Sequence, residues 1–434
     1  MYSVGLYTLG CKVSQYETEA LSEAFVAAGF AVRRFDEPCD VYVINTCTVT
    51  SESDRKSRQV IRRARKTNPD GIILVMGCYS QRSPDEVMRI EGVRAVVGTE
   101  NKLSLVGIAK ELLEGKREKY SSVTDVNFAE FEPMRITRAE RTRAYVKIED
   151  GCECRCTYCA IADARGRVRS KPSADVVAEV EGLSRSGVRE IVLTGIETGS
   201  YGADLEDGQD LASLLCEIDK LEGIGRVRLG SLDPTVIKPG FVEKIKNLKS
   251  LAPHFHLSLQ SGSDKVLAAM KRKYNSRQAM QSIERLREAM PSVKFTTDII
   301  TGFPGESDED FECSCDFARR AEFLMVHAFP YSKRKGTPAA EMKDQIPEDV
   351  KKQRVHTLTE ICRNVRSKMF DRIIEDGEPR EVLFESFDGE YATGHTADFI
   401  EVRVKSDRPM HAELAYVKIL SHNTESCEGI LIDK

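Results

Sequence analysis

The sequence predicts an α/β protein built from three parts, and three observations lead to that prediction. Over residues 1–115, apolar strand-like runs alternate with helical segments in the pattern of an open parallel α/β domain. Six further strand–helix units occupy residues 141–375 and favour an open partial (β/α)6 barrel. Short strands with polar turns fill residues 376–434 and indicate a small antiparallel β-barrel. Residues 116–140 are charged and poor in periodicity, and are predicted to be a linker.

Length and composition place the chain among globular proteins. Its 434 residues, of which 41% are hydrophobic and 31% charged, suffice for two or three domains with their own cores. No run approaches the roughly 20 apolar residues that span a bilayer, and residues 1–5 lack a charged leader, so we expect a cytoplasmic protein with no membrane partner. The 13 cysteines are expected to stay reduced or to bind metal. With a net charge of −5, RNA contacts must come from local basic patches.

The first hundred residues alternate strands with helices. Ser14 as N-cap and Glu17 three residues later form a capping box, which predicts a helix that ends at Gly29. The apolar residues of this helix recur with helical spacing. The other expected elements are a basic helix over residues 53–66 and strands over residues 4–9, 41–44 and 72–76.

Each of these three strands is followed by a cysteine, namely Cys11, Cys47 and Cys78. Ligands of open parallel sheets gather beyond the carboxyl ends of the strands, so three cysteines that are distant in sequence could converge there. A single cysteine of this kind is more often an inert core thiol. The repeated placement nevertheless favours a shared cluster site.

A second group of cysteines follows the strand-like run at residues 144–148. Cys152, Cys156 and Cys159 have the C-x3-C-x2-C spacing that suits three corners of an iron–sulfur cube and leaves the fourth iron open. Zinc is the rival ligand, but zinc sites usually use paired C-x2-C hooks, and no second hook follows. Reduced thiols in a buried turn are a third interpretation. We expect Cys154 to be a bystander, because using it in place of Cys152 leaves a single residue before Cys156.

The central part carries its unusual residues on loops. Strands are expected over residues 144–148, 190–193, 226–229, 254–259, 294–300 and 324–329, with helices such as residues 174–186, opened by Ser173, and residues 277–289. Function in such barrels lies on the loops after the strands. The loops in question are residues 194–199, 230–232, 260–262, 302–306 and 331–337.

The last part begins after a long helix. This helix is expected from residue 348 to about residue 374 and is followed by Gly377. Alternating polar and apolar residues then predict strands over residues 381–385, 391–395, 399–404 and 415–419.

Four sequence motifs resemble the methylthiotransferase family of radical S-adenosylmethionine (SAM) enzymes. They are Leu-Gly-Cys-Lys-Val at residues 9–13, Gln-Tyr-Glu-Thr-Glu at residues 15–19, Val-Ile-Asn-Thr-Cys-Thr-Val-Thr at residues 43–50 and Lys-Ser-Arg-Gln at residues 56–59. The most similar branch is the one that acts on threonylcarbamoyladenosine in tRNA. The resemblance implies SAM and two 4Fe-4S clusters as cofactors. The radical-SAM cluster would use Cys152, Cys156 and Cys159, and the auxiliary cluster Cys11, Cys47 and Cys78.

The same resemblance assigns roles to the loops. Residues 194–199 correspond to the stretch that meets the methionyl amine of SAM, and the later loops line its ribose and adenine and the substrate. The implied cofactor-binding residues are Tyr158, Thr194, Gly195, Glu197, Thr198, Gly199, Ser231, Gln260, Gly302, Phe303 and Pro304. Two features depart from the family pattern. Ala162 and Asp163 replace an apolar residue followed by Pro and an aromatic residue, and Glu197 stands where His or Asn is common.

By position the C-terminal barrel resembles the TRAM domain that family members use on RNA. Acidic residues outnumber basic ones in it, however, so its charge gives weak support for RNA binding. Basic residues beside the proposed clusters are better candidates, although a solvated helix face is the ordinary role of such runs. The residues expected to contact RNA are Arg58, Arg62, Lys333 and Arg334.

Together these features predict an enzyme. The expected reaction is radical methylthiolation of C2 of N6-threonylcarbamoyladenosine at position 37 of tRNA. No side-chain acid or base is required, because the chemistry takes place on the clusters. The expected partners are the anticodon stem-loop of tRNA, a sulfur source and an electron donor such as flavodoxin or ferredoxin. The alternatives are methylthiolation of isopentenyladenosine or of a ribosomal-protein aspartate, and a non-catalytic iron–sulfur RNA-binding or sensor protein.

Overall fold

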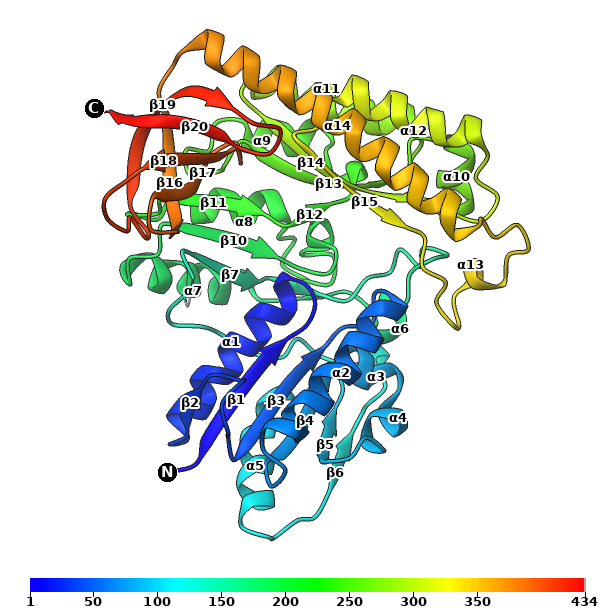
Figure 1. The fold of residues 1–434 in the computed structure, drawn as a ribbon, viewed down its shortest axis with the longest axis vertical. Coiled ribbons are helices and arrows are strands. Elements are labelled where there is room, and N and C mark those ends of the chain that lie inside the picture. Colours follow the sequence, from blue (N-terminus) through cyan, green and yellow to red (C-terminus); the bar gives the residue numbers. More distant parts are fainter. Residues whose placement is uncertain (140, 433–434) are drawn as a thin grey trace.

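The N-terminal part is a parallel sheet between two layers of helices (Figure 1). The computed structural model describes residues 1–139 and 141–432. The strand order is β2-β1-β3-β4-β5-β6, and all neighbours are parallel. The strands are β1 (Ser3–Thr8), β2 (Ala31–Arg33), β3 (Val41–Thr46), β4 (Ile72–Gly77), β5 (Val93–Val97) and β6 (Tyr120–Ser122). The three strands that precede cysteines, β1, β3 and β4, are therefore direct neighbours.

Helices cover both faces of this sheet. They are α1 (Lys12–Ala27), α2 (Ser51–Thr67), α3 (Cys78–Arg82), α4 (Pro84–Met88) and α5 (Leu105–Leu113). Leu21 and Phe25 of α1 share one core with Leu105 of α5, whereas Val60 and Ile61 of α2 belong to the core on the opposite face. The alternating pattern of the sequence therefore yields a three-layer domain.

The capping-box prediction at Ser14 and Glu17 was wrong. Helix α1 begins at Lys12, with Cys11 at its N-cap position, and no side chain caps it. Glu17 is fully buried and faces cationic side chains instead of the helix end. A capping-box pattern cannot distinguish a capping carboxylate from one that is held by partners far along the chain.

The predicted linker, residues 116–140, is ordered over its described part, and residue 140 lies outside the described residues. It supplies strand β6 to the N-terminal sheet. Met134 and Ile136 are buried, and the Tyr16 hydroxyl and the Ile136 amide tie the segment to α1 and to Glu179. The segment lacks helical and strand periodicity because its apolar residues fill gaps between the two larger parts.

The central part is the expected partial barrel of parallel strands. One sheet has the order β11-β10-β7 and the other the order β12-β13-β14-β15, and only Gly230 separates β11 from β12. A short antiparallel pair, β8 (Glu149–Asp150) and β9 (Arg169–Ser170), flanks the cysteine loop. The barrel strands are β7 (Arg143–Lys147), β10 (Glu190–Thr194), β11 (Arg226–Leu229), β12 (Ser231–Leu232), β13 (His254–Gln260), β14 (Lys294–Thr301) and β15 (Met325–Pro330).

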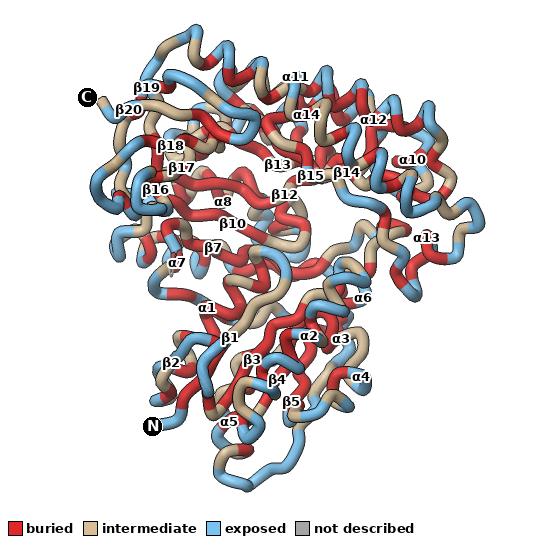
Figure 2. The backbone as a smooth tube through the Cα atoms, viewed as in Figure 1, coloured by how far each residue is buried: buried red, intermediate tan, exposed pale blue. Residues whose placement is uncertain are grey.

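Helices cover the outside of this barrel (Figure 1). Phe255, Leu257 and Phe295 point into the core beneath them, and Figure 2 shows buried residues concentrated along the strands. The helices of the central part are α6 (Ile161–Arg165), α7 (Ser173–Arg185), α8 (Leu211–Ile218), α9 (Pro239–Ile245), α10 (Asp264–Ala269), α11 (Ser276–Ala289), α12 (Asp308–Ala321), α13 (Pro338–Glu341) and α14 (Glu348–Asp376), of which α6 packs against α3 of the N-terminal part. Short 3-10 turns lie at Lys102–Ser104, Val126–Phe128, Thr198–Ser200 and Pro234–Val236.

The C-terminal part is a closed five-stranded barrel of the TRAM-like type, in the order β16-β17-β18-β20-β19. Its strands are β16 (Arg380–Phe387), β17 (Tyr391–Thr396), β18 (Glu401–Lys405), β19 (Leu414–His422) and β20 (Cys427–Ile432). Strand β20 was not expected from the sequence, and its parallel pairing with β18 closes the barrel. No helix in the described part of the chain is long and apolar enough to cross a membrane.

The two barrels meet at Phe399. Its ring stacks on His254 with 4.5 Å between the ring centroids, and the Arg228 guanidinium lies 4.8 Å from its centroid. Arg143 approaches the same ring. Because β7, β11 and β13 all contribute to this contact, Phe399 closes one end of the space inside the partial barrel.

Candidate functional site

Cys11, Cys47 and Cys78 follow β1, β3 and β4, and their exposure falls from exposed through intermediate to buried. The loop before Cys11 lies against Cys47, since a Cβ added to Gly10 would lie 3.6 Å from the Cys47 sulfur. Gly10 has φ +122°, a conformation that favours glycine. Burial, together with the nearby thiols of Cys47 and Cys11, raises the pKa of Cys78 to about 12, although the charge of Arg165 acts in the opposite direction. The fold thus brings together Cys11, Cys47 and Cys78, the three cysteines that the sequence analysis assigned to one site.

Arg165, at the end of α6, links this set to the central cysteine loop. Its Nε donates to the Cys78 sulfur at 3.3 Å, and one of its terminal nitrogens donates to Glu17 at 2.6 Å and to Asp150 at 3.0 Å. Asp150 directly precedes the loop, and its carboxylate accepts from the Gly151 amide. One buried guanidinium therefore contacts both halves of the candidate site.

Glu17 is the main acceptor in this buried charge cluster. Besides Arg165, the ammonium groups of Lys102 and Lys147 face it at 3.4 Å and 3.2 Å. Burial alone would raise the pKa of Glu17, but the charges of Arg165, Lys102 and Lys147 lower it to about 2. The carboxylate is therefore ionised at neutral pH, and it ties α1 to β7 and α6.

The central cysteines lie in one loop between β8 and α6. Arg272 donates to the Cys156 sulfur at 3.3 Å, and the Ile161 amide donates to the Cys159 sulfur at 3.4 Å. The Cys152 amide donates to the Gly166 carbonyl at 2.9 Å, which fixes the first cysteine of the loop. Cys156 is buried, and Cys152 and Cys159 are half-buried.

Neither set has the compact geometry of a single-ion site. In the part of the chain that the structure describes, the only trio of possible ligands whose donor atoms all lie within 4.8 Å of one another is His256, Asp298 and His327. An iron–sulfur cube spreads its thiolates over different irons, whereas zinc draws its ligands around one ion. All cysteines are free, and N–H groups donate to three of the six sulfurs, as hydrogen bonds that tune iron–sulfur clusters do. The residues present fit cubes better than zinc.

The loop after β10 borders a cleft of about 590 Å³, a volume suited to a cofactor-sized molecule. Glu197, Gly199 and Cys154 line it. Burial, then the charges of Asp233 and Cys154, raise the pKa of Glu197 to about 8. The Glu197 amide donates to the buried Glu149 carboxylate at 2.9 Å, so this carboxylate shapes the loop.

Two buried polar atoms at this loop have no partner, Glu149 Oε1 and Thr198 Oγ1. Thr194 ends β10 and is buried, and a Cβ on Gly195 would collide with the Glu149 carboxylate. Polar groups that are buried without partners are rare, and a bound amine or hydroxyl would satisfy them. The loop therefore fits a polar ligand such as SAM.

The later loops divide into ligand-accessible and structural positions. Ser231 and Gln260 are half-buried, and Gln260 has φ +69°. Gly302 donates its amide to Glu306 at 2.6 Å. Phe303 is fully buried against Tyr331, and Tyr158 packs on the same apolar cluster. Pro304 is also buried. Roles for these residues in SAM binding stay predictions.

The expected RNA-binding residues differ in accessibility. Arg62 and Lys333 are exposed. Arg58 is half-buried and donates to the Tyr79 hydroxyl at 3.0 Å. Arg334 is buried and pairs with Asp54 at 2.7 Å, so it connects the loop after β15 to α2. A buried arginine that is paired with a carboxylate is not available to RNA. A run of basic residues in the sequence does not show which of them are buried.

Sequence reasoning missed the arginines that touch the cysteine sulfurs. The sequence analysis singled out neither Arg165 nor Arg272. Asp150 and Glu149 were also missed, although both directly precede the cysteine loop. The acidic pair directly before the cysteine motif was the sequence feature that could have indicated a role for these two residues.

Two family models match the chain. The radical SAM superfamily matches residues 146–318, and an uncharacterized protein family, UPF0004, matches residues 3–98. Among solved structures, the radical SAM methyltransferase TsrM of Kitasatospora setae has a TM-score of 0.57 at 16% identity and covers 78% of this chain and 77% of its own. The radical enzyme OxsB has a TM-score of 0.52 at 13% identity, with 85% and 58% covered. These two structures show the fold alone.

Curated relatives cover nearly the whole chain. The threonylcarbamoyladenosine tRNA methylthiotransferase MtaB of Bacillus subtilis is 40% identical, with 99% of this chain and 96% of the relative covered. That of Thermotoga maritima is 38% identical, with 94% and 95% covered. The tRNA-2-methylthio-N(6)-dimethylallyladenosine synthase of Carboxydothermus hydrogenoformans is 33% identical, with 98% of both covered. The chain therefore belongs to the radical-SAM methylthiotransferases, enzymes that use S-adenosylmethionine and two 4Fe-4S clusters.

Proposed function

We propose that this enzyme adds a methylthio group to C2 of N6-threonylcarbamoyladenosine at position 37 of tRNA, giving 2-methylthio-N6-threonylcarbamoyladenosine. The higher identity to the relatives named for threonylcarbamoyladenosine, 40% against 33%, supports this base over dimethylallyladenosine. The structural observation that carries the proposal is α6. It starts two residues after Cys159 and ends at Arg165, which contacts Cys78, so the two cysteine sets flank one short helix.

Each cluster has a defined set of residues in this proposal. Cys152, Cys156 and Cys159 would hold the SAM-binding cluster, and Cys11, Cys47 and Cys78 the auxiliary one. SAM would meet the loop of Thr194–Gly199, with Glu149 and Thr198 offering it buried polar atoms. When bound, these groups supply radical chemistry at an unactivated C–H bond, which side-chain acids and bases cannot break.

The protein's own residues position and protect this chemistry. Arg272 joins Cys156 to the Asp233 carboxylate at 2.7 Å and to the Ser258 carbonyl at 2.8 Å, which fixes the cysteine loop against β13. Phe399 packs on His254 and Arg228 at the far end of the barrel, where it would limit the entry of water. Exclusion of water protects a reactive intermediate from side reactions.

RNA contact is proposed for the exposed basic face of α2 together with Lys333. The Ser51 hydroxyl, at the start of α2, lies 3.0 Å from the Ser332 hydroxyl, so these basic segments adjoin although they are far apart in sequence. Their positive charge beside the cysteines suits the phosphates of an anticodon stem-loop. A sulfur source and an electron donor such as flavodoxin or ferredoxin complete the reaction, which belongs in the cytoplasm with its tRNA.

Mass spectrometry of tRNA nucleosides tests this function. Deleting the gene should remove 2-methylthio-N6-threonylcarbamoyladenosine and leave its unthiolated precursor, and the wild-type gene should restore it. Loss of the methylthio derivative of isopentenyladenosine instead would assign the enzyme to the other tRNA branch. Unchanged tRNA with altered ribosomal-protein aspartate would assign it to the protein-modifying branch.

A further inference from the structure

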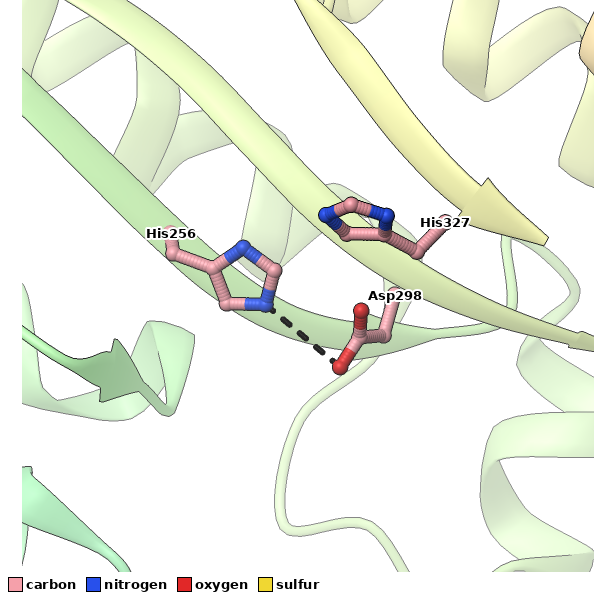
Figure 3. Close-up of side chains that lie close together, drawn as sticks. All are labelled: His256, Asp298 and His327. Carbon is pink, nitrogen blue, oxygen red and sulfur yellow. Dashed lines mark ion pairs between the residues drawn. The ribbon is translucent and has the colours of Figure 1, made fainter. Parts of the chain in front are cut away.

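His256, Asp298 and His327 form a polar cluster inside the partial barrel that the proposed cofactor sites do not use. They lie on the neighbouring strands β13, β14 and β15, and Figure 3 shows the three side chains on one side of the sheet. The His256 Nε2 atom is 3.4 Å from the Asp298 carboxylate, and the imidazole centroids of His256 and His327 are 5.9 Å apart. Asp298 and His327 are direct partners in the sheet register.

This cluster faces the space inside the barrel. Successive side chains of a strand point to opposite faces. Phe255, Leu257 and Ile299 point outward into the helix-covered core. His254 points inward, because it stacks on Phe399 at the closed end, and residues of the same parity follow it on the inner face. The cluster therefore lies between this closed end and the carboxyl end of β13, which Gln260 marks.

The cluster remains accessible. His327 is exposed, and His256 and Asp298 are half-buried. Lys12, next to Cys11 at the start of α1, lies within electrostatic reach of Asp298 and His327. Within the described residues, no hydrogen bond or ion pair holds the Lys12 ammonium group. A cation, a carboxylate and two imidazoles thus lie near one another on the inner side of the partial barrel, close to Cys11.

The hydrogen-bond chain behind His256 argues against a metal ion. The Thr296 hydroxyl lies 3.0 Å from His254 Nε2 and 2.9 Å from His256 Nδ1. Burial keeps His254 neutral by lowering its pKa, and its Nδ1 has no partner. Orphaned buried N–H groups are rarer than orphaned acceptors, so the His254 proton sits on Nε2 and is donated to Thr296.

Thr296 then donates to His256 Nδ1, and the proton of His256 sits on Nε2, facing Asp298. A protonated nitrogen is not a metal ligand. Asp298 is thereby oriented as a hydrogen-bond acceptor, with one oxygen toward His256 and the other left for a ligand donor. Acceptors, donors and a cation in one place suit a ligand group that carries both a carboxylate and O–H or N–H groups.

We propose that His256, Asp298, His327 and Lys12 bind the polar substituent of the target base, the carboxylate- and hydroxyl-bearing threonylcarbamoyl group. The proposal rests on the proposed function and adds to it the residues that select this base. The Lys12 ammonium and the imidazoles face the carboxylate, and Asp298 accepts from the hydroxyl or ureido N–H groups. A dimethylallyl group would leave these side chains unpaired, which is how a polar site rejects an apolar analogue.

Binding of three anticodon stem-loops to the oxidised, cluster-loaded protein tests the site without turnover. The RNAs are identical except that the target adenosine is unmodified, threonylcarbamoylated or dimethylallylated. The wild type should bind the threonylcarbamoyl RNA at least about tenfold more tightly than the dimethylallyl RNA. His327→Leu and Asp298→Leu should reduce this ratio to near one. His356→Leu, at an exposed histidine of α14, should keep it.

The outcomes separate the two proposals. A wild type without preference, or variants that retain the wild-type ratio, would overturn the substituent site even if threonylcarbamoyl RNA is methylthiolated. A preference that both variants lose, combined with methylthiolation of dimethylallyl RNA alone, would overturn the proposed function and leave the binding site standing. Stoichiometric binding of added Zn²⁺ that His327→Leu abolishes, with the RNA ratio unaffected, would identify a metal site and overturn the proposal.

Discussion

The two cysteine sets are brought together by different routes. Cys152, Cys156 and Cys159 lie in one loop, whose entry at Gly151 has φ +91°, and an added Cβ there would strike the Arg167 carbonyl. Cys11, Cys47 and Cys78 come from three neighbouring strands and converge only when the sheet forms. The first set is therefore encoded locally, and the second depends on long-range packing.

The two sets share one feature: in each, a buried arginine donates a hydrogen bond to one cysteine sulfur. Arg165 donates to the Cys78 sulfur and Arg272 donates to the Cys156 sulfur, each with a nitrogen–sulfur distance of 3.3 Å. Hydrogen bonds to sulfur are among the factors that set the reduction potential of a cluster. The difference lies in what holds each arginine: Arg165 depends on Glu17 and Asp150, whereas Arg272 depends on Asp233 and a backbone carbonyl.

The largest expected effect is on the set that depends on packing. Glu17→Gln leaves Arg165, Lys102 and Lys147 buried without their shared counter-charge, and loss of one partner from a buried ion cluster costs about 3–5 kcal/mol. Calorimetric unfolding should show this loss, together with reduced cluster content at the N-terminal set. Glu52→Gln, in an exposed pair with Arg55, should leave the stability almost unchanged, because solvent screens an exposed ion pair.

The effect of Glu17 should depend on pH in a defined direction. Its pKa is lowered to about 2 in the folded protein, from 4.5. A lowered pKa means that the carboxylate stabilises the fold above pH 4.5, and that this contribution is lost as the pH falls toward 2. The stability difference between wild type and Glu17→Gln should therefore shrink over that interval. A difference that is constant from pH 6 to about 2 would contradict the buried ion cluster.

A smaller effect tests whether the two sets are independently tuned. Arg165→Lys keeps the charge near Glu17 but removes the N–H donor to Cys78, and Arg272→Lys does the same at Cys156. A charge-assisted hydrogen bond of about 1.4 kcal/mol corresponds to roughly 60 mV for one electron. Redox titration followed by electron paramagnetic resonance should show each variant lowering the potential of its own cluster. Equal shifts of both clusters in either variant would contradict separate tuning.

The smallest expected effect concerns Cys154. Its side chain lines the cleft with Glu197, and the C-x3-C-x2-C set is complete without it. Cys154→Ala should keep the iron content and SAM cleavage of the wild type, whereas Cys152→Ala should lose one cluster. The reverse pattern would reassign the first ligand of the loop.

The sequence predicted best what is encoded locally. The spacing of the central cysteines, the barrel strands and helix α14 followed from patterns of a few residues. Even the convergence of Cys11, Cys47 and Cys78 could be predicted, because parallel strands end at one edge of a sheet. Whether these six cysteines and the loop residues hold the cofactors remains a prediction.

Features set by partners far along the chain could not be predicted. Glu17 matched a capping box because its true partners, Lys102, Lys147 and Arg165, lie far from it in the sequence. Arg334 matched a basic patch, although Asp54 holds it in the interior. The segment containing Met134 matched a linker because its burial depends on both neighbouring parts.

The central claim is a division of labour between the two cysteine sets. SAM cleavage should need only Cys152, Cys156 and Cys159, whereas sulfur transfer should also need Cys11, Cys47 and Cys78, since the substrate must have a sulfur donor within bonding distance. The most direct test assays both products of a Cys11/Cys47/Cys78→Ala variant in one reaction with dithionite and threonylcarbamoyl-modified tRNA. The account predicts 5′-deoxyadenosine without any methylthio-nucleoside. Formation of the methylthio-nucleoside by this variant would contradict it.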